Sequence, residues 1–283
     1  MIVNLISINQ GSPEWLALRK TKITSTDAGV IMGVNPWKTP LQLYNEKISN
    51  DPPKPSNEAM RRGIELEPIA RDLFNLKTGL EMIPKVYVND WTMASLDGAS
   101  LIDDCILEIK CPGEKDHTIA LSGKIPEHYF PQLQHAMYVA NARGAYYYSF
   151  DGIDGVIVPV KRDDDYIEKM LVEEKKFYEC LLKKTPPEPT ERDYVEKTDF
   201  DWESCAERWK EINAKISALQ DEEEVIRKKL IAMCNNQNSQ GFGIKLAQIS
   251  RKGNVDYGKI PELKNVDLEQ YRKASIVSWR ITK

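Results

Sequence analysis

Two acidic residues and a lysine stand close together in the middle of the sequence. Asp97 follows an apolar run, and Glu108-Ile109-Lys110 ends the next one. The pattern predicts two strands joined by a tight turn, which would bring Asp97 back beside Glu108. Because side chains alternate along a strand, Glu108 and Lys110 share one face and Ile109 faces away. Such carboxylates suit a hard divalent ion such as Mg²⁺, and the lysine could orient a metal-bound water or offset charge on a phosphate.

A surface hairpin with an ordinary Glu–Lys pair is the competing interpretation, because the E-x-K pattern is short and common. The run from Cys105 to Ile109 is otherwise apolar, as in a buried strand. Charged side chains are rarely buried unless they are paired or bind a metal. This context favours a functional site.

A third carboxylate lies on the apolar face of a predicted helix. Residues 56–78 predict a long helix capped by Ser56. At about 100° per residue, one broad arc collects its apolar residues, which are Met60, Gly63, Ile64, Leu66, Ala70, Leu73 and Phe74. Glu67 lies near the middle of this arc, where an unpaired carboxylate is strongly disfavoured. Two interpretations remain open: an ion pair with Arg62 or Arg71, or a metal ligand.

The predicted helix 126–142 shows the same pattern more mildly. Gln132 lies among its apolar residues, whereas Gln134 and His135 lie away from them. A buried glutamine is usually a hydrogen-bonded core residue, and the alternative is a contact with substrate or a metal-bound water. Pro131 predicts either a kink or the true start of this helix.

The overall composition fits a soluble globular protein of one or two domains. The chain has 283 residues, 41% hydrophobic and 29% charged, with a net charge of −4. No stretch approaches the roughly 20 apolar residues of a membrane span, and the N-terminal residues do not form a signal peptide. The five scattered cysteines, without a C-x-x-C pair, indicate free thiols in a reducing cytoplasm. Motifs of phosphate loops, dinucleotide-binding folds, zinc proteases and serine hydrolases are absent.

The order of predicted elements is helices, then a largely antiparallel sheet, then more helices, which indicates an α+β fold. A proline-rich run at 185–189 reads as a linker. We therefore expect one domain over residues 1–185 and a C-terminal extension over residues 190–283.

The predicted extension consists of a long charged helix over 201–234, followed by strands near 242–251 and 275–282. The helix fits either a coiled-coil interaction segment or a solvated helix with charge pairs one turn apart. Residues 245–283 carry more Lys and Arg than Asp and Glu. This basic segment fits either a contact surface for phosphates or a solvated tail.

Five motifs occur in one order along the first part of the chain. They are Gly11-Ser-Pro-Glu-Trp15 with its continuation to Asp27, Gly63-x-x-x-Glu67, Leu96-Asp97-Gly98, Glu108-Ile109-Lys110-Cys111-Pro112, and Tyr129-x-x-Gln132-x-Gln134. Together they closely resemble the phage lambda exonuclease and YqaJ-type viral recombinase family, within the PD-(D/E)xK nucleases. The resemblance covers about residues 10–180, and Leu96 replaces the proline of the superfamily name. It implies a restriction-endonuclease-like core, a central mixed sheet flanked by helices, with a helical and β C-terminal extension.

The resemblance implies a role for each matching position of the catalytic centre. Asp97, Glu108 and the backbone carbonyl of Ile109 would be metal ligands, and Glu67 would help to hold the site. Lys110 would position and activate the attacking water, and Gln132 would lie beside that water or the scissile phosphate. The implied cofactor is a pair of Mg²⁺ ions, which Mn²⁺ could replace.

The resemblance also implies contacts with DNA. Arg19, with hydroxyls at Thr26 and Ser95, would hold the 5′-phosphate of a DNA end, a role that suits the planar guanidinium. By its residue type alone, Arg19 is more often an ordinary surface arginine. Further candidates for DNA contacts are Tyr129, Gln134, Arg251, Lys252, Arg272 and Lys273.

The implied activity is Mg²⁺-dependent digestion of double-stranded DNA from its 5′ ends, releasing 5′-mononucleotides and leaving 3′ single strands for phage-type homologous recombination. The implied partners are duplex ends, a single-strand annealing protein and further copies of the chain in a ring-shaped trimer. The implied location is the host cytoplasm of a phage or prophage. The alternatives are a structure- or sequence-specific endonuclease and a non-catalytic module that binds DNA ends.

Overall fold

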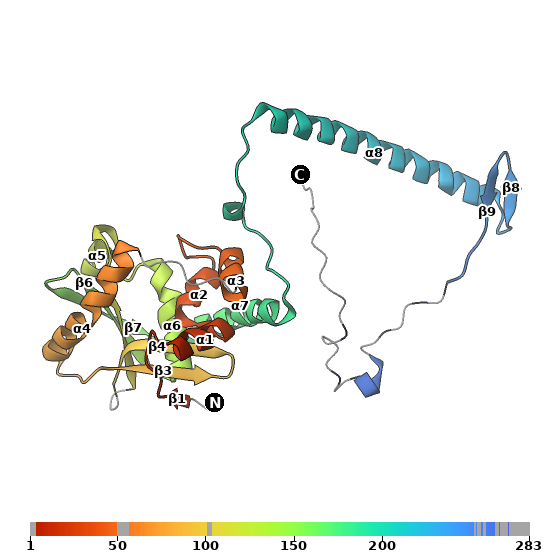
Figure 1. The fold of residues 1–283 in the computed structure, drawn as a ribbon. Coiled ribbons are helices and arrows are strands. Elements are labelled where there is room, and N and C mark those ends of the chain that lie inside the picture. The colour runs from red at the N-terminus through yellow and green to blue at the C-terminus, as the bar shows by residue number, and fades with distance from the viewer. Residues whose placement is uncertain are drawn as a thin grey trace. The chain divides into compact units, whose positions relative to one another are not determined.

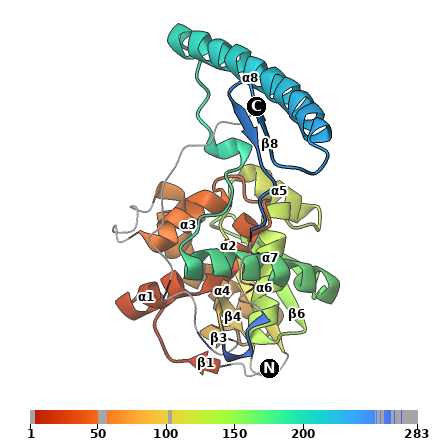
Figure 2. The ribbon, with the colours of Figure 1, turned by 90° about the vertical axis from the view of Figure 1, so that its right-hand side faces the viewer.

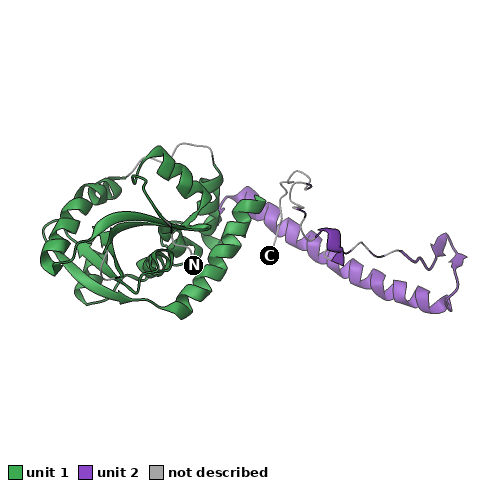
Figure 3. Cartoon of the chain, turned by 90° about the horizontal axis from the view of Figure 1, so that it is seen from below, with its two compact units in different colours: residues 1–194 green, residues 195–283 purple. Residues whose placement is uncertain are grey.

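The chain divides into two compact units, residues 1–194 and residues 195–283 (Figure 3). The computed structural model describes residues 4–49, 57–100, 104–251, 253, 256, 259–263, 266 and 271. The first unit extends past the predicted linker, because Arg192 donates hydrogen bonds to the carbonyls of Asn35 and Pro36, both at 2.8 Å, and Thr39 donates one to Asp193. The expected cap Ser56 and the expected strand 275–282 lie outside the described residues.

A mixed β-sheet forms the centre of the first unit, with strand order β1-β3-β4-β5-β6-β7 and β2 paired to β4. The β5–β6 and β2–β4 pairs are parallel, and the other pairs are antiparallel. The strands are β1 (Asn4–Ile6), β2 (Ile23–Thr24), β3 (Ile83–Asn89), β4 (Thr92–Ala99), β5 (Cys105–Lys110), β6 (Gly144–Phe150) and β7 (Gly155–Lys161).

Helices flank this sheet (Figures 1 and 2). They are α1 (Pro13–Thr21), α2 (Ser25–Ile31), α3 (Pro40–Ile48), α4 (Glu58–Thr78), α5 (Glu114–Leu121), α6 (Phe130–Ala140) and α7 (Asp164–Lys183), with short 3₁₀ turns at Glu127–Tyr129 and Glu191–Asp193. Helix α4 packs Phe74 against Leu107 and Ile109 on one face of the sheet. Helix α6 packs against Ile106 and Tyr147 on the other face. The predicted α+β architecture, a central mixed sheet flanked by helices, is confirmed.

Helix α4 buries less of its apolar arc than the periodicity predicts. It starts after Asn57, whose side chain accepts a hydrogen bond from Met60 N, and it ends at Gly79, which adopts a left-handed φ of 71°. Only Ala70 and Phe74 are buried, whereas the N-terminal turns leave Met60 60% exposed. Pro68 lies between these halves. Because proline removes one backbone hydrogen bond of a helix, it separates the turns that pack on the sheet from those that do not.

Helix α6 is buried nearly all round, which corrects the expectation that Gln134 and His135 lie away from the core. Both are fully buried, because α6 contacts α2 and α7 as well as the sheet. The Gln134 amide donates to the Lys161 carbonyl and accepts from Asp163 N, both at 2.9 Å. Pro131 lies in the first turn and marks the start of the helix.

His135 joins α6 to α7 through a buried ion pair. Its Nδ1 lies 2.7 Å from Oε1 of Glu174, and neither side chain is exposed. Burial alone would lower the pKa of His135, but the Glu174 carboxylate outweighs burial and raises this pKa above its ordinary value. Removing either partner would leave an uncompensated buried charge, because only the attraction within the pair offsets the cost of taking both groups out of water.

The second unit contains the long helix α8 (Phe200–Met233), which confirms the predicted helix within a residue or two, and a hairpin of β8 (Ser239–Gly241) and β9 (Ile244–Leu246). The single strand expected over 242–251 is therefore a short hairpin that begins earlier, with Phe242 and Gly243 at positive φ in its turn. Throughout the described parts of both units, no helix combines the length and apolarity that a membrane crossing requires.

Candidate active site

A β-bulge in β4 positions Asp97. The pairing register of β3 and β4 shifts between Ile83 and Lys85, so that Asp97 and Gly98 together lie opposite Pro84. Proline has no N–H to donate to the ladder, and bulges redirect the side chains of the strand that carries them. Glycine is required beside Asp97, because an added Cβ at Gly98 would lie 2.8 Å from Met82 Cβ.

The ladder between β4 and β5 ends just before the site. Its pairs are Gly98 with Leu107 and Ala99 with Ile106. Beyond them, the backbone N–H of Ile109 donates to Oδ2 of Asp97 at 2.7 Å instead of to the neighbouring strand. The N–H and C=O of one strand residue point to the same side. The carbonyl of Ile109 therefore faces the gap that contains Asp97.

Glu108 and Lys110 project from the opposite side of β5 to Ile109, as predicted. Nζ of Lys110 lies 2.5 Å from Oε1 of Glu108, and Glu108 is only 3% exposed. The amide of Gln132 on α6 donates to the same Oε1. The ring centroid of Tyr129 lies 5.3 Å from Nζ of Lys110. The structure thus brings four of the predicted site residues together.

Glu67 reaches the same region through an arginine. Nη2 of Arg71 donates to Oε1 of Glu67, and Nε of Arg71 donates to the backbone carbonyl of Asp97 at 2.5 Å. The ion pair left open by the sequence is therefore formed with Arg71. Arg62 instead donates to the carbonyl of Asp151 at 2.6 Å. Arg71 binds Glu67 and the bulge of Asp97 at once, so Glu67 lies at the edge of the carboxylate cluster.

The carboxylates of this cluster repel one another. Burial raises the pKa of Asp97 well above its ordinary value, and the charges of Glu108 and Glu67 raise it further. Burial also raises the pKa of Glu67, although the charge of Arg71 partly offsets this shift. Burial would lower the pKa of Lys110, but the Glu108 and Asp97 carboxylates outweigh burial and raise it. Burial together with the neighbouring carboxylates therefore disfavours the charged form of Asp97, and a cation bound there would favour it.

The donor set fits a hard divalent cation that keeps some of its water. Within the described parts of the chain, no three acid, histidine or cysteine side chains lie close enough together to hold an ion as they stand. Mg²⁺ is usually bound by one or two carboxylates, with waters and substrate phosphates as its other ligands. Asp97, Glu108 and the Ile109 carbonyl meet that need, and the raised pKa of Asp97 shows that added positive charge would be favourable there.

A second cluster surrounds Arg19. Its Nη2 donates to Oγ1 of Thr26 at 3.1 Å, and its guanidinium lies 4.4 Å from the ring centroid of Trp15. The indole N–H of Trp15 donates to Oγ of Ser95 at 2.8 Å. The structure thus brings the three predicted phosphate-binding residues together, and Ser95 lies on β4 close to Asp97. Trp15, which links them, lies in the quoted N-terminal motif but was not predicted as a site residue.

A buried ion pair fixes the backbone below Arg19. Nζ of Lys47 on α3 lies 2.8 Å from Oδ2 of Asp27, and it also donates to the carbonyls of Arg19 and Lys22 at 2.9 and 2.8 Å. Asp27 accepts a hydrogen bond from the N–H of Thr24 at 2.8 Å, as part of a capping box. The capping-box spacing makes Asp27 predictable, but no local pattern links it to Lys47.

The remaining candidates for DNA contacts separate into three groups. Gln134 is a core residue bonded at both amide atoms, so we assign it a structural role and no longer propose it as a DNA contact. Arg251 is exposed near the end of the described chain. Lys252, Arg272 and Lys273 lie outside the described residues.

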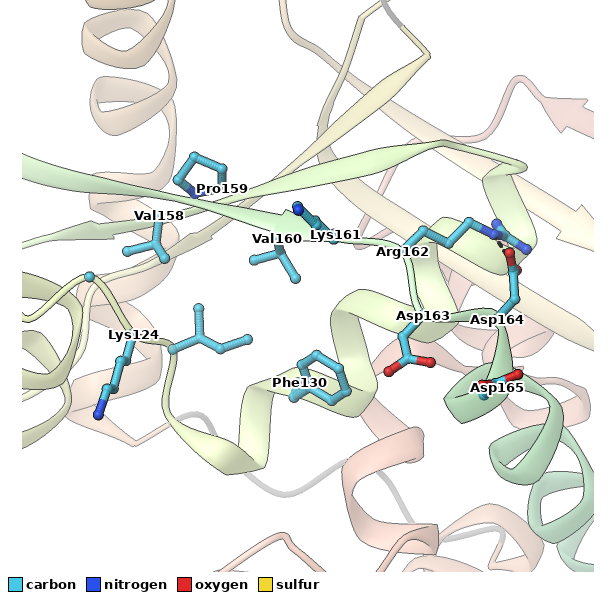
Figure 4. Close-up of a pocket in the computed structure, with 12 residues that line it drawn as sticks. Lys124, Phe130, Val158, Pro159, Val160, Lys161, Arg162, Asp163, Asp164 and Asp165 are labelled. Carbon is cyan, nitrogen blue, oxygen red and sulfur yellow. Dashed lines mark hydrogen bonds and ion pairs between the residues drawn. The ribbon is translucent and has the colours of Figure 1, made fainter.

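A separate groove of about 800 Å³ lies between the segment before α6 and the turn from β7 to α7 (Figure 4). Ile125, Phe130, Val158 and Val160 line it with apolar surface, and its charged residues are Lys124, Lys161, Arg162 and Asp163 to Asp165. None of the predicted catalytic residues lines this groove. At the carboxylate cluster, Lys110, Gln132 and Arg71 contact the acids.

Known proteins resemble this chain in sequence and in the fold of its first unit. The family profile of the YqaJ-like viral recombinase domain matches residues 14–143. The YqaJ protein of Bacillus subtilis (strain 168) is 29% identical over 174 residues, covering 58% of this chain and 54% of YqaJ. Protein R354 of Acanthamoeba polyphaga mimivirus is 26% identical over 156 residues, covering 49% of this chain and 28% of R354. The matches thus span about half of YqaJ and less than a third of R354.

Two solved structures share the fold. Both are of LHK-Exo, an alkaline exonuclease from Laribacter hongkongensis, and each comparison covers 62% of this chain and 94% of the exonuclease. The structure in complex with dAMP is 25% identical with a TM-score of 0.53, and the other is 24% identical with a TM-score of 0.51. Residues 14–143 of this chain are therefore similar to the YqaJ-like viral recombinase domain, and the first unit shares the fold of the alkaline exonuclease LHK-Exo.

Proposed function

We propose that this chain is a metal-dependent deoxyribonuclease that digests one strand of duplex DNA from its 5′ end. It would release 5′-mononucleotides and leave 3′ single strands for phage-type recombination. The observation that carries the proposal is the carboxylate cluster, where a bulge and the end of a ladder bring Asp97 beside Glu108 and Lys110. The YqaJ-like domain supports the nuclease class, and the relative solved with dAMP supports a mononucleotide product.

Asp97, Glu108 and the carbonyl of Ile109 would hold Mg²⁺, with Glu67 at the edge of the site. When bound, Mg²⁺ or Mn²⁺ lowers the pKa of water and stabilises charge on the reacting phosphate. The protein's part is to hold these ligands in place. Arg71 fixes the Asp97 carbonyl, and Gln132 fixes the Glu108 carboxylate. Both contacts come from helices packed on the sheet, so α4 restrains the backbone at Asp97 and α6 restrains the side chain of Glu108.

Lys110 acts as a cation in this mechanism. Its raised pKa means that its ammonium group keeps its proton while Glu108 and Asp97 are charged. An ammonium can donate hydrogen bonds to the attacking water and to a phosphate oxygen, but it cannot accept a proton. Lys110 therefore orients the water and offsets charge that develops in the transition state.

Arg19, Thr26 and Ser95 would bind the 5′-phosphate at the end of the DNA. Their position supports this role, because β4 carries both Ser95 and Asp97. A terminal phosphate held there would set the distance from the strand end to the reacting phosphodiester. This is the feature that favours an exonuclease over an endonuclease, which does not need to recognise an end. A ring-shaped trimer and a single-strand annealing partner remain part of the proposal through the family resemblance.

The test of the proposal is digestion of linear duplex DNA labelled at its 5′ end, with and without Mg²⁺. We expect labelled mononucleotide to appear first, only with metal, whereas a label at the 3′ end of the same strand should be released last. Closed circular duplex is the matched substrate without ends, and it should survive. Cutting of the circle would replace the exonuclease with the endonuclease alternative. Binding to ends without cleavage under any divalent metal would leave only the end-binding module.

Changing Arg19 to alanine is expected to reduce the preference for 5′-phosphorylated over 5′-hydroxyl ends by about tenfold to a hundredfold. A hydrogen bond to a charged group contributes about 1.5–3 kcal/mol, and 1.4 kcal/mol is a factor of ten. The measurement compares initial digestion rates on the two kinds of end.

Thr26 provides the matched controls for this experiment. Thr26→Ser keeps the hydroxyl that Arg19 contacts and should keep the preference, whereas Thr26→Val keeps the shape and should weaken it. If Arg19→Ala leaves the ratio of the two rates unchanged, Arg19 belongs to the structure of α1 and not to end recognition.

A further inference from the structure

Helix α8 exposes a long apolar seam. It has 34 residues, and none of them is buried by the other described residues of the second unit. Leu219 is 64% exposed and Met233 is 74% exposed. A helix of this kind gains most of its stability from packing its apolar side against another surface. The seam is therefore expected to pack against a surface outside the described residues of the second unit.

The seam follows a strict seven-residue repeat. The first core position of each heptad is occupied by Trp202, Trp209, Ile216, Glu223 and Leu230, and the second by Cys205, Ile212, Leu219, Ile226 and Met233. Every one of these residues except Glu223 is apolar or a thiol. A period of seven, kept over several turns, specifies a left-handed coiled coil rather than packing against a globular surface.

Glu223 decides the orientation of a second copy of the helix. In a parallel pair, identical core positions meet, so two Glu223 carboxylates would face each other inside the seam. Burying like charges together is strongly unfavourable. In an antiparallel pair with full overlap, Glu223 instead lies opposite Ile212 of the second copy. Lys215 of that copy lies within one turn and can neutralise Glu223.

The antiparallel arrangement also pairs the remaining core layers. The core layers become Trp202 with Met233, Trp209 with Ile226, Ile216 with Leu219, Glu223 with Ile212, and Leu230 with Cys205, each residue paired with the second copy's. On the flank, Lys215 of each copy faces Glu222 of the other, whereas Arg208 faces Lys229. The flank thus contributes one attractive and one repulsive kind of pair, and the core layers select the pairing.

We propose that α8 is a docking helix for a second copy of this chain, through an antiparallel coiled coil of the two α8 helices. The surface is self-complementary, so one two-fold axis between Ile216 and Leu219 relates the copies. The proposal does not depend on the nuclease activity of the first unit.

Disulfide trapping in the full chain tests the orientation. Cys205 and Cys234 are free thiols, and all variants carry Cys234→Ser. Under oxidation, Leu230→Cys should form a covalent dimer through Cys205 and position 230, identified by mass spectrometry of the linked peptides. Without Leu230→Cys no covalent dimer should form, and Cys205→Ser with Leu230→Cys should also form none. Cross-linking of Cys205 to itself would show a parallel pair and overturn the proposal.

Light scattering of the full chain tests the seam itself. Ile216→Asp places a charge in the central layer and should halve the mass of the assembly. Ser217→Asp adds the same charge outside the seam and should leave the mass unchanged. The result is the ratio of the assembly mass of the variant to that of the wild type. Association through the first unit is present in both proteins and therefore does not change this ratio. Equal masses for wild type and Ile216→Asp would overturn the proposal, including the case in which residues 272–283 cover the seam.

Discussion

Replacing Lys110 with alanine is expected to slow DNA cleavage by about 10²- to 10³-fold, the range observed when one preorganised charge-stabilising donor is removed. Its ammonium lies 2.5 Å from Oε1 of Glu108 and is held cationic by Glu108 and Asp97. The substitution removes the group that orients water and offsets phosphate charge, while the surface that binds DNA is unchanged. Binding to duplex DNA, measured by fluorescence anisotropy with Ca²⁺ in place of Mg²⁺, should remain close to that of the wild type.

Two further variants separate chemistry from stability in this experiment. Lys110→Gln can still donate a hydrogen bond to the buried Glu108 and should fold normally, yet it should lose cleavage as Lys110→Ala does. Lys176→Ala removes an exposed lysine from α7 and should have no effect. Cleavage by Lys110→Gln at a rate near that of the wild type would remove the Lys110 charge from the mechanism.

Asp97→Asn is expected to abolish cleavage and to stabilise the metal-free protein. Loss of a metal ligand removes several kcal/mol of transition-state stabilisation, which corresponds to about 10³-fold or more in rate. Asparagine keeps an oxygen that can accept the N–H of Ile109 but relieves the repulsion from Glu108 and Glu67. The melting temperature should rise by about 2–4 °C for each kcal/mol of repulsion removed.

The charged Asp97 carboxylate is expected to destabilise the metal-free protein, and this makes its stability depend on pH. The pKa of Asp97 is higher in the folded protein than its ordinary value of 3.8, so the folded state keeps the proton to higher pH than the unfolded chain. Stability of the metal-free wild type therefore falls as pH rises from about 3.8 through the folded pKa, and it stays reduced above that pKa. In Asp97→Asn, most of this fall should disappear, and only the smaller contribution of Glu67 should remain.

Thermal melting with and without Mg²⁺ at alkaline pH checks both parts of the prediction. Mg²⁺ should raise the melting temperature of the wild type, because a ligand that binds only the folded state stabilises it. It should raise that of Asp97→Asn much less. A metal-free Asp97→Asn protein that melts below the wild type would mean that the Asp97 carboxylate stabilises the fold and that the cluster is not strained by its own charge.

Part of the site could be predicted because it depends on neighbours in the sequence. Alternation along one strand places Glu108 and Lys110 on the same face, and the structure confirms this. The conflict between Glu67 and its apolar arc likewise predicted a cationic partner. The sequence could not choose between Arg62 and Arg71, because both flank Glu67 on the helix. The choice depends on the turn at Asp151, because its backbone carbonyl accepts a hydrogen bond from Arg62 and so leaves Arg71 to pair with Glu67.

Other features of the site depend on contacts between distant segments. The bulge at Asp97 requires Pro84 on a different strand, and the cluster at Arg19 requires Trp15 to meet Ser95. The burial of Gln134 was missed because amphipathicity describes a helix with one covered face. Helix α6 instead packs between the sheet and other helices, so its polar residues are bonded inside the core.

The sequence by itself determined the residue types of the site, their placement on strands and helices, and the heptad repeat of α8, because these follow from periodicities of two, 3.6 and seven residues. The tertiary structure alone decided which cation meets which carboxylate and where the β4–β5 ladder ends. The physical reason is that desolvation and Coulomb interactions depend on distance in space. The pKa of Asp97 is raised because residues from β5 and α4 surround it. No local sequence pattern predicts these contacts, because they join segments that are distant in the chain.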